Sequence, residues 1–423
     1  MNPASPKSRA TFNDSLSALR LTTNEARRNI SVAQFAALHY NYPAMPVELA
    51  AANYNWLCTG REVFPAMLSA IEAARESICL ETYIYSGDAL GERFRGALVV
   101  ARRRGVEVRV LFDALGSLGL SNSFWDPLRA VGADVLRFNP SLLNRFGIRD
   151  HRKMLVMDRR VAFVGGFNIA SEYDGDGVNC GWCDLGLKIE GPLAAQLAAS
   201  FEEMFARARS PQTPLLRLTQ SGAKRTVVAP REQLLLSGPG RGRSPIKTAL
   251  RRDLAHARDV RIMMAYFLPT WRMRRSIVRV TRTGGRVELI LAGKSDVTLS
   301  QLAGQSLYRR FLKAGARIHE YQPQVLHAKL LIMDDIVYVG SANLDQRSLN
   351  INYELMIRLH SQTIATQARE IFQNTMKHCR EITLEDWRKH RTLWRRIKQH
   401  LAYLVLVRID PHIGRWKWRA FAD

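Results

Sequence analysis

Two short motifs combine residue types that can carry out phosphoryl-transfer chemistry. Both have the spacing His-x-Lys-x4-Asp. An imidazole can attack phosphorus or transfer a proton, and an ammonium group can neutralise the non-bridging oxygens of a phosphodiester. Two copies supply two imidazoles, so one can be the nucleophile while the other is general acid and then general base. The candidate catalytic residues are His151, Lys153, Asp158, His327, Lys329 and Asp334.

A glycine-containing stretch that ends in asparagine follows each motif: Gly-Gly-Phe-Asn ends at Asn168, and Gly-Ser-Ala-Asn ends at Asn343. Amide, hydroxyl and backbone N–H groups are suitable donors to phosphoryl oxygens. We therefore expect phosphate binding by Asn168, Asn343, the Ser341 hydroxyl and the backbone of Gly166.

Metal chemistry is not expected from these motifs. The sequence lacks an obvious acidic cage around them, and the two lysines already supply positive charge. The pair Cys180 and Cys183 has CxxC spacing but no second pair of ligands, so we interpret it as two structural thiols. We expect no metal and no other cofactor.

The elements that position these residues can be read from the apolar pattern. Residues i and i+2 of an extended segment face the same side, so the histidine and lysine of each motif project together. The apolar runs 154–157 and 330–333 follow, and the runs 161–164 and 336–339 return. This pattern predicts a two-stranded ribbon in each half that brings the asparagine beside the histidine. Asp158 and Asp334 then lie at the far end of the ribbon, where turn stabilisation competes with a catalytic role.

The ribbons belong to an internal repeat. A helical stretch followed by a strand occurs at 63–85 and again at 246–269, and a further strand occurs at 106–112 and at 287–291. Short apolar runs that alternate with helices predict an α/β fold with a mixed sheet flanked by helices in each half. We expect two halves related by a pseudo-twofold axis, with the active site at their interface.

The repeat suggests a division of the chain into five parts. Residues 1–50 form an N-terminal extension, 51–209 the first repeat, 236–380 the second repeat and 381–423 a C-terminal segment. Residues 210–235 are expected to be the linker, because this region is rich in Pro, Gly, Ser and Arg.

Composition limits the class of protein and its partners. The chain has 423 residues, of which 47 % are hydrophobic and 24 % charged, which excludes a disordered chain, a collagen-like fibre and a polytopic membrane protein. No apolar stretch approaches the roughly 18–20 residues of a transmembrane helix. The net charge of +24 indicates a polyanionic partner, either nucleic acid or an anionic membrane.

The C-terminal segment favours a membrane. From Arg388 onward it combines ten Lys or Arg and two Asp with tryptophans, among them Trp394, Trp416 and Trp418. This composition is typical of an interfacial segment. The short apolar run 401–407 either contacts the membrane or packs on the main body.

The paired motifs, with their Gly-Gly-x-Asn and Gly-Ser-x-Asn continuations, resemble those of the phospholipase D superfamily. Several strings more narrowly resemble bacterial cardiolipin synthases of the short type, over about residues 57–375. They are Gly60–Ala66, Glu81–Ile84, Ile189–Pro192, Ala265–Pro269, Glu320–Pro323 and Gly340–Asp345.

The resemblance implies a phosphatidyltransferase that makes cardiolipin from two phosphatidylglycerol molecules through a phosphatidyl-histidine intermediate. It implies His151 as nucleophile and His327 as acid and base. It also implies that Asp184 and Glu354 orient the histidines, of their own or the opposite half. The implied partners are phosphatidylglycerol and the cytoplasmic side of the inner membrane.

Three alternatives stay open at this point. A hydrolytic phospholipase D and an endonuclease would use the same paired histidines, although the lipid-like strings and the Trp/Arg segment favour lipid over nucleic acid. A non-catalytic binding protein conflicts with two complete motifs. Phosphatidylethanolamine or another alcohol could replace the second phosphatidylglycerol, and the sequence does not determine the oligomeric state.

Overall fold

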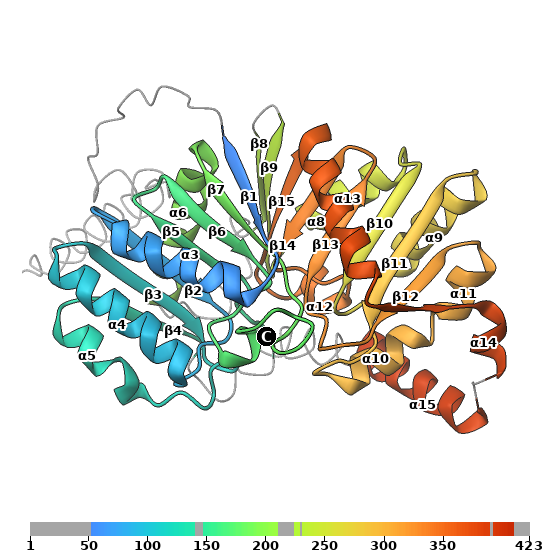
Figure 1. The fold of residues 1–423 in the computed structure, drawn as a ribbon, viewed down its shortest axis with the longest axis horizontal. Helices are drawn as coiled ribbons and strands as arrows, with labels where there is room; N and C mark the ends of the chain where they lie inside the picture. Colours follow the sequence, from blue (N-terminus) through green and yellow to red (C-terminus); the bar gives the residue numbers. More distant parts are fainter. Residues whose placement is uncertain (1–51, 140–146, 210–223, 229–230, 390–391, 410–423) are drawn as a thin grey trace, which may run out of the picture. The chain divides into compact units, whose positions relative to one another are not determined.

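The computed structural model describes residues 52–139, 147–209, 224–228, 231–389 and 392–409 (Figure 1). These described residues belong to one compact unit. The expected N-terminal extension 1–50 lies outside them, as do parts of the expected linker and the tail from residue 410, which includes Trp416 and Trp418.

Seven strands build the first sheet, in the order β1-β7-β6-β5-β2-β3-β4. Strands β2, β3 and β4 are parallel, and the other pairs are antiparallel. The strands are β1 Asn53–Leu57, β2 Ser77–Thr82, β3 Glu107–Asp113, β4 Asp134–Phe138, β5 Met154–Met157, β6 Val161–Gly165 and β7 Gly186–Glu190. The helices are α3 Gly60–Ala73, α4 Ala89–Arg103, α5 Asp126–Ala130 and α6 Pro192–Arg209, with short 3-10 turns η1 Asn122–Trp125 and η2 Ser171–Tyr173.

The second sheet repeats this order and adds a strand at each edge: β16-β12-β11-β10-β13-β14-β15-β9-β8. The strands are β8 Arg225–Val228, β9 Glu232–Ser237, β10 Asp259–Met264, β11 Arg286–Ala292, β12 Arg317–Tyr321, β13 Lys329–Met333, β14 Ile336–Gly340, β15 Glu354–His360 and β16 Cys379–Ile382. The helices are α8 Pro245–Leu254, α9 Trp271–Arg282, α10 Thr298–Gln305, α11 Tyr308–Lys313, α12 Gln346–Asn350, α13 Gln362–Met376, α14 Leu384–Lys389 and α15 Leu393–Leu404, which continues into the π turn η4 Val405–Ile409.

The two sheets confirm the expected α/β architecture of two similar halves. The inner seven strands of the second sheet, read from β9 to β12, follow the same order as the strands of the first sheet. The order β9-β15-β14-β13-β10-β11-β12 corresponds to β1-β7-β6-β5-β2-β3-β4. Strands β1, β4 and β7 and their counterparts were not anticipated, because each is only five to seven residues long and has no distinctive periodicity. The expected linker also contains β8 and the start of β9, which pair with each other in the second sheet.

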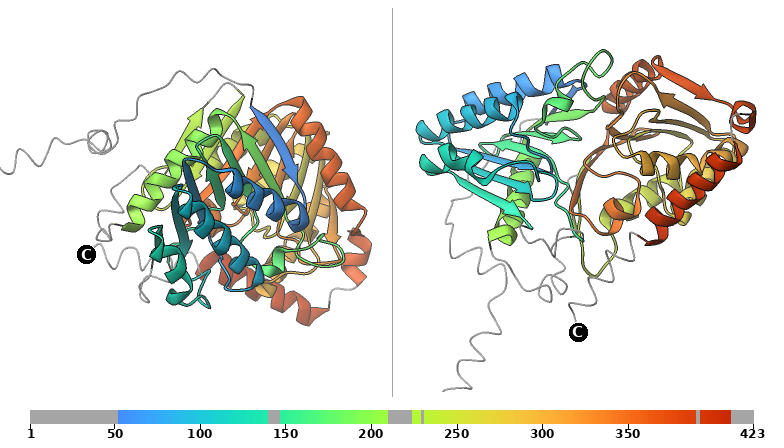
Figure 2. Two further views of the ribbon diagram at one scale, coloured as in Figure 1. Left: turned by 60° about the vertical axis from the view of Figure 1, so that its left-hand side comes forward. Right: turned by 90° about the horizontal axis from the view of Figure 1, so that it is seen from below.

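Local sequence determines where the helices begin. Thr59 caps α3 by accepting the Glu62 N–H, while Glu62 accepts the Cys58 N–H at 2.6 Å, a reciprocal capping arrangement. Asp88 caps α4 in the same way by accepting the Gly91 N–H at 3.0 Å. Both helices then bury one apolar face on the outer side of the first sheet (Figure 2).

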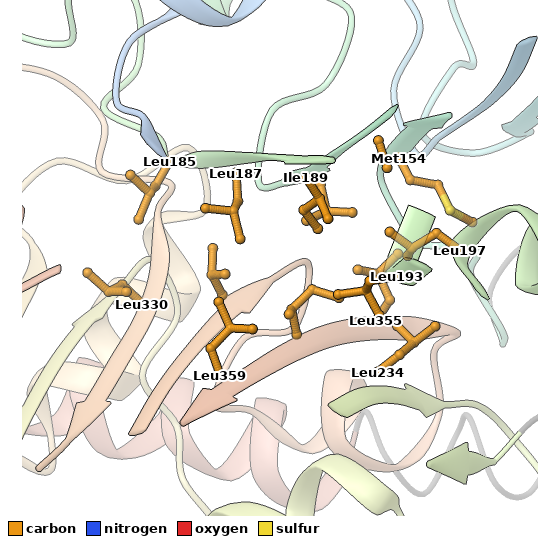
Figure 3. Packing of buried hydrophobic residues seen from close by; sticks show 14 of the residues in the cluster. Met154, Leu185, Leu187, Ile189, Leu193, Leu197, Leu234, Leu330, Leu355 and Leu359 are labelled. Atoms are coloured by element: carbon orange, nitrogen blue, oxygen red, sulfur yellow. The ribbon is translucent and has the colours of Figure 1, made fainter. Parts of the chain in front are cut away.

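The largest apolar cluster joins the two halves. It combines the inner faces of both sheets with α6 and α13. Figure 3 shows Leu187 and Ile189 of β7 opposite Leu355 and Leu359 of β15. Because these side chains are almost fully buried, the interface is part of the hydrophobic core and fixes the two halves relative to each other.

Most of the apolar run 401–407 packs on the main body in the structure, whereas Leu401 is exposed. Ala402 is buried, and Tyr403, Leu406 and Val407 pack against the core of the second half. Helix α15 lies beside α10 (Figure 1). Within the described ranges, none of the helices has the length and apolar character needed to cross a bilayer.

Candidate active site

Short cross-connections between the halves position both histidines. The His151 N–H donates to the Tyr353 carbonyl at 3.0 Å, and the Tyr353 N–H donates to the Arg149 carbonyl at 2.8 Å. In the other direction, the His327 N–H donates to the Cys183 carbonyl at 2.7 Å. Each histidine is thereby paired with the residue that precedes a carboxylate of the opposite half.

The carboxylates consequently reach across the interface. His151 Nδ1 lies 3.1 Å from both carboxylate oxygens of Glu354. The Ser341 hydroxyl donates to Glu354 Oε2 at 2.5 Å. Burial raises the pKa of Glu354 to about 8 despite the nearby lysine charges. Burial, reinforced by Lys153, also holds the pKa of His151 well below its ordinary value, which keeps the imidazole neutral.

His327 has a tighter carboxylate partner. Its Nδ1 lies 2.6 Å from Asp184 Oδ2, and the other Asp184 oxygen accepts the Leu185 N–H at 2.7 Å. Burial alone would raise the pKa of Asp184, but His327 and Lys329 outweigh it and the pKa is lowered. Burial and Lys329 lower the pKa of His327 in turn, with Asp184 opposing the shift. An ionised Asp184 fixes the Nδ1–H tautomer and exposes Nε2 to a substrate.

The residue that packs against each carboxylate differs between the halves, as does the length of the acidic side chain. A Cβ at Gly166 would lie 2.1 Å from Asp184 Oδ1, so the glycine leaves room for this side chain. The equivalent position in the second half is Ser341, which binds the longer Glu354 through its hydroxyl.

In the structure the Gly166 backbone and the Ser341 hydroxyl, both expected to bind phosphate, have partners within the protein. The Gly166 N–H donates to the Leu185 carbonyl at 3.1 Å, and the Ser341 N–H donates to the Leu355 carbonyl at 2.9 Å. Both donors are therefore used within the sheets, and the Ser341 hydroxyl faces Glu354. Both residues support a carboxylate in the structure, and neither offers a donor to a phosphate.

The two motif lysines lie beneath the histidines. Lys153 Nζ donates to the His151 carbonyl at 2.8 Å, and Lys329 Nζ donates to the His327 carbonyl and lies 2.8 Å from His327 Nδ1. Burial lowers the pKa of Lys153 to about 7 and that of Lys329 to about 8. Their charge is therefore easily influenced by an anion bound in the site.

The asparagines are oriented for donation. The Ile84 N–H donates to Asn168 Oδ1 at 3.0 Å, and the Tyr266 N–H donates to Asn343 Oδ1 at 3.4 Å. Because each carbonyl oxygen is bound to backbone, the NH2 group is the part of the side chain that is left to donate. The Asn168 NH2 group also donates to the Tyr173 hydroxyl at 2.6 Å.

Asp158 and Asp334 do not join this cluster, which corrects their place among the candidate catalytic residues. Asp158 accepts the backbone N–H groups of residues 75, 76 and 77 at 2.8–3.0 Å. Asp334 accepts those of residues 258 and 259. Both have positive φ, about 50°, in the turn at the far end of the ribbon. They stabilise the turn and connect it to the start of the neighbouring strand in the sheet, β2 for Asp158 and β10 for Asp334.

Both histidines and both asparagines line one cavity of about 560 Å³. A cavity of this size accommodates the polar headgroup of a lipid or another small molecule. Its remaining wall was not anticipated, because it comes from loops that the topology brings together. The main additional side chains are Tyr83, Arg149, Tyr173, Tyr266, Leu268, Asp296, Val297, Asp345, Arg347, Leu406 and Val407.

Aromatic side chains pack beside each imidazole. The Tyr83 ring lies 4.9 Å from the His151 ring, and the Tyr173 and Trp182 rings lie 5.3 and 5.6 Å from the His327 ring. The Tyr266 hydroxyl donates to Asp296 at 2.5 Å. Tyr83 and Tyr266 lie within two of the short strings named above, Glu81–Ile84 and Ala265–Pro269, but no local pattern indicates that they contact the site.

Within the described ranges, no group of three or more His, Cys, Asp or Glu side chains is arranged to hold a metal ion. Cys180 and Cys183 are free thiols. The site as described is a pair of carboxylate-oriented imidazoles with two buried ammonium groups and two amide donors. This set can hold a phosphodiester and exchange one of its ester oxygens by covalent catalysis.

Comparison with known proteins agrees with this chemistry. The sequence profile described as "Cardiolipin synthase, PLD-like domain" matches residues 67–206 and 250–376. The chain is 32 % identical over 363 residues to "Cardiolipin synthase 1" of Bacillus anthracis, covering 82 % of this chain and 71 % of that one. It is 30 % identical over 364 residues to "Cardiolipin synthase B" of Salmonella typhi, covering 84 % and 88 %.

A solved structure has the same fold at low sequence identity. Phosphatidylserine synthase of Haemophilus influenzae matches with a TM-score of 0.65 and 16 % identity, over 85 % of this chain and 94 % of that one.

Proposed function

Because the chain belongs to the cardiolipin synthase family of phospholipase D-like phosphatidyltransferases, we propose that it makes cardiolipin from two molecules of phosphatidylglycerol. The observation that carries the proposal is the pair of imidazoles, one from each half, on a single cavity, each held by a carboxylate of the other half.

The first step forms a covalent intermediate. Nε2 of His151 attacks the phosphorus of phosphatidylglycerol, a P–N bond forms, and the P–O bond to glycerol breaks. His327 donates its proton to the departing glycerol oxygen. The low pKa of His151 suits the nucleophile, which must be neutral. Burial and Lys329 lower the pKa of His327 as well, but the ionised Asp184 opposes this shift and so favours the protonated form that a proton donor needs.

The second step transfers the phosphatidyl group from His151 to the acceptor. His327, now neutral, removes the proton from a glycerol hydroxyl of a second phosphatidylglycerol. The hydroxyl oxygen attacks phosphorus, the P–N bond breaks, and His151 is restored. Cardiolipin and one glycerol are the products. In both transition states, Lys153 and Lys329 stabilise the negative charge that develops on the phosphoryl oxygens. Asn168 and Asn343 donate hydrogen bonds to the same oxygens.

A phosphatidylglycerol substrate, which resides in the bilayer, requires the enzyme to act at a membrane surface. Cardiolipin synthases act on bilayer lipids, and the +24 net charge favours an anionic surface. We place the protein on the cytoplasmic side of the inner membrane, with phosphatidylglycerol as both phosphatidyl donor and acceptor.

The proposal is tested by adding purified full-length protein to phosphatidylglycerol vesicles and identifying the products by mass spectrometry. Cardiolipin and glycerol in equal amounts are the expected result. Phosphatidic acid without cardiolipin would show that water resolves the intermediate, as in a phospholipase D hydrolase. Nicking of DNA without lipid turnover would indicate an endonuclease instead. Added phosphatidylethanolamine or another alcohol tests the choice of acceptor in the same assay.

A further inference from the structure

Helix α15 exposes four of its large apolar side chains to solvent. Leu393, Trp394, Ile397 and Leu401 are 71 %, 71 %, 41 % and 56 % exposed. At 3.6 residues per turn these four residues occupy an arc of about 100° on the helix. The opposite side buries Gln399, which donates to the Gln305 side chain of α10 at 3.3 Å. An ordinary surface helix keeps its large apolar side chains against the protein, so an exposed arc of four of them is unusual.

The exposed apolar face extends to the cavity. Val297 and Leu299, at the start of α10, are each 40 % exposed, and Val297 also lines the cavity. The chain continues from α15 into Leu406 and Val407, which line the same cavity. We call the residues Val297, Leu299, Leu393, Trp394, Ile397 and Leu401 the α10–α15 patch.

Basic side chains flank the part of this patch that lies on α15. On α15, Arg396 lies on one side of the apolar arc and Lys398 on the other. Neither α15 nor the neighbouring α9 contains an acidic residue. Arg274 of α9 lies over the Tyr403 ring of α15 at 5.6 Å, so the five arginines of α9 belong to a helix that contacts α15. A second copy of this chain would bring like charges together, whereas an anionic lipid surface would neutralise them.

We propose that the α10–α15 patch is the surface that docks on an anionic bilayer, with α15 in the interface plane and the cavity opening beside it. The inference rests on the proposed function and adds the part of the molecule that contacts the lipid. Trp394 and the aliphatic side chains enter the boundary between headgroups and acyl chains, and the flanking Arg and Lys bind lipid phosphates.

The size of the cavity supports this arrangement. An acyl chain reaches about half-way through a hydrocarbon core roughly 30 Å thick, so the four chains of two lipids exceed what a headgroup-sized cavity can hold. With the patch docked, the phosphate and glycerol enter the cavity while the acyl chains stay in the bilayer along Val297, Leu406 and Val407.

The test compares the full-length protein with the variant Trp394→Glu/Ile397→Glu. The matched control is Val100→Glu, a 52 % exposed valine on α4, away from the patch. Binding is measured by co-sedimentation with phosphatidylglycerol vesicles and with phosphatidylcholine vesicles. Turnover is measured on phosphatidylglycerol vesicles and on a short-chain, monomeric phosphatidylglycerol. Sedimentation velocity gives the oligomeric state.

We expect the patch variant to bind phosphatidylglycerol vesicles about a hundredfold more weakly, with turnover on vesicles falling in parallel. Its turnover of the monomeric lipid should be within about twofold of wild type, because neither side chain lines the cavity. The control should bind and turn over both substrates as wild type does. Wild-type vesicle binding should be much weaker with phosphatidylcholine.

The inference is overturned if the patch variant binds phosphatidylglycerol vesicles as tightly as wild type. It is also overturned if the substitutions convert a dimer to a monomer without changing vesicle binding, since the patch would then be an interface between copies. Failure of the proposed function has a different signature: wild type would convert neither form of phosphatidylglycerol.

Discussion

Substituting Gly166 by alanine should abolish most of the activity while leaving the fold intact. The added Cβ would lie 2.1 Å from Asp184 Oδ1 and 2.6 Å from Oδ2, well inside van der Waals contact. Asp184 is fully buried and held by His327 and by the Leu185 N–H, so it can move only by giving up those bonds. The φ of Gly166 is not in the left-handed region, so the backbone itself accepts alanine.

The expected size of the effect follows from what Asp184 does. A displacement of about 1 Å in a catalytic constellation costs about a hundredfold, and loss of the group that fixes a catalytic imidazole costs up to about ten-thousandfold. We therefore expect turnover of phosphatidylglycerol to fall by about 10²–10⁴, which corresponds to about 3–5 kcal/mol in the activation free energy. The loss of one buried hydrogen bond should reduce the free energy of unfolding by only about 1–3 kcal/mol.

Two further variants make the interpretation specific. Gly96→Ala is the matched control, because a Cβ at this exposed glycine of α4 would meet no atom within 4 Å. It should keep full activity and gain about 0.5–1 kcal/mol in stability. The double variant Gly166→Ser/Asp184→Glu reproduces the Ser341–Glu354 pair of the other half and should recover part of the lost activity. Near wild-type turnover of Gly166→Ala, measured by cardiolipin formation with matched thermal stability, would refute the reasoning.

Three other predictions test the remaining parts of the site. His151→Ala and His327→Ala should each lower turnover by at least about 10⁴-fold, and substantial activity in either would contradict a mechanism that needs both imidazoles. In wild type, deprotonation of Lys153 and Lys329, whose pKa values burial lowers to about 7 and about 8, should reduce turnover at high pH. Ionisation of Glu354, whose pKa burial raises to about 8, should oppose this fall with a component that rises with pH, because the carboxylate accepts the His151 Nδ1–H. Glu354→Gln should lose the component of turnover that rises with pH, because an amide does not titrate. An unchanged pH–rate profile would assign that rising component to another group. Asp158→Ala should reduce the free energy of unfolding by about 2 kcal/mol, from its three lost backbone bonds, with kcat nearly unchanged. A selective loss of kcat without loss of stability would return Asp158 to the catalytic set.

Local patterns in the sequence predict the ribbons and the residues they carry. The alternation around His151 and His327, the turn at Asp158 and the return to Asn168 depend only on neighbours along the chain, and the structure has all of them. The repeat likewise predicts two similar sheets, because each half has the same order of apolar runs.

Contacts between the halves could not be predicted in the same way. Which histidine Glu354 approaches depends on the bridge between Asp150 and Tyr353, and no local pattern encodes that register. The close approach of Gly166 to Asp184 is equally non-local, so the local pattern predicts only a phosphate-binding role for this glycine. The cavity wall comes from loops and from η4, whose positions follow from packing on the second half.

The most direct test of the central claim is the mass of the protein during turnover. His327→Ala lacks the proton donor that the departure of glycerol needs, so it is mixed with phosphatidyl-p-nitrophenol, whose nitrophenolate leaves without a proton. Because this variant also lacks the base that activates the acceptor hydroxyl, the intermediate should persist at neutral or alkaline pH. Peptide mapping should find one phosphatidyl group on the peptide that contains His151, and none in His151→Ala. A phosphatidyl group on the His327 peptide of wild type, or cardiolipin formation with no covalent adduct at all, would contradict the account.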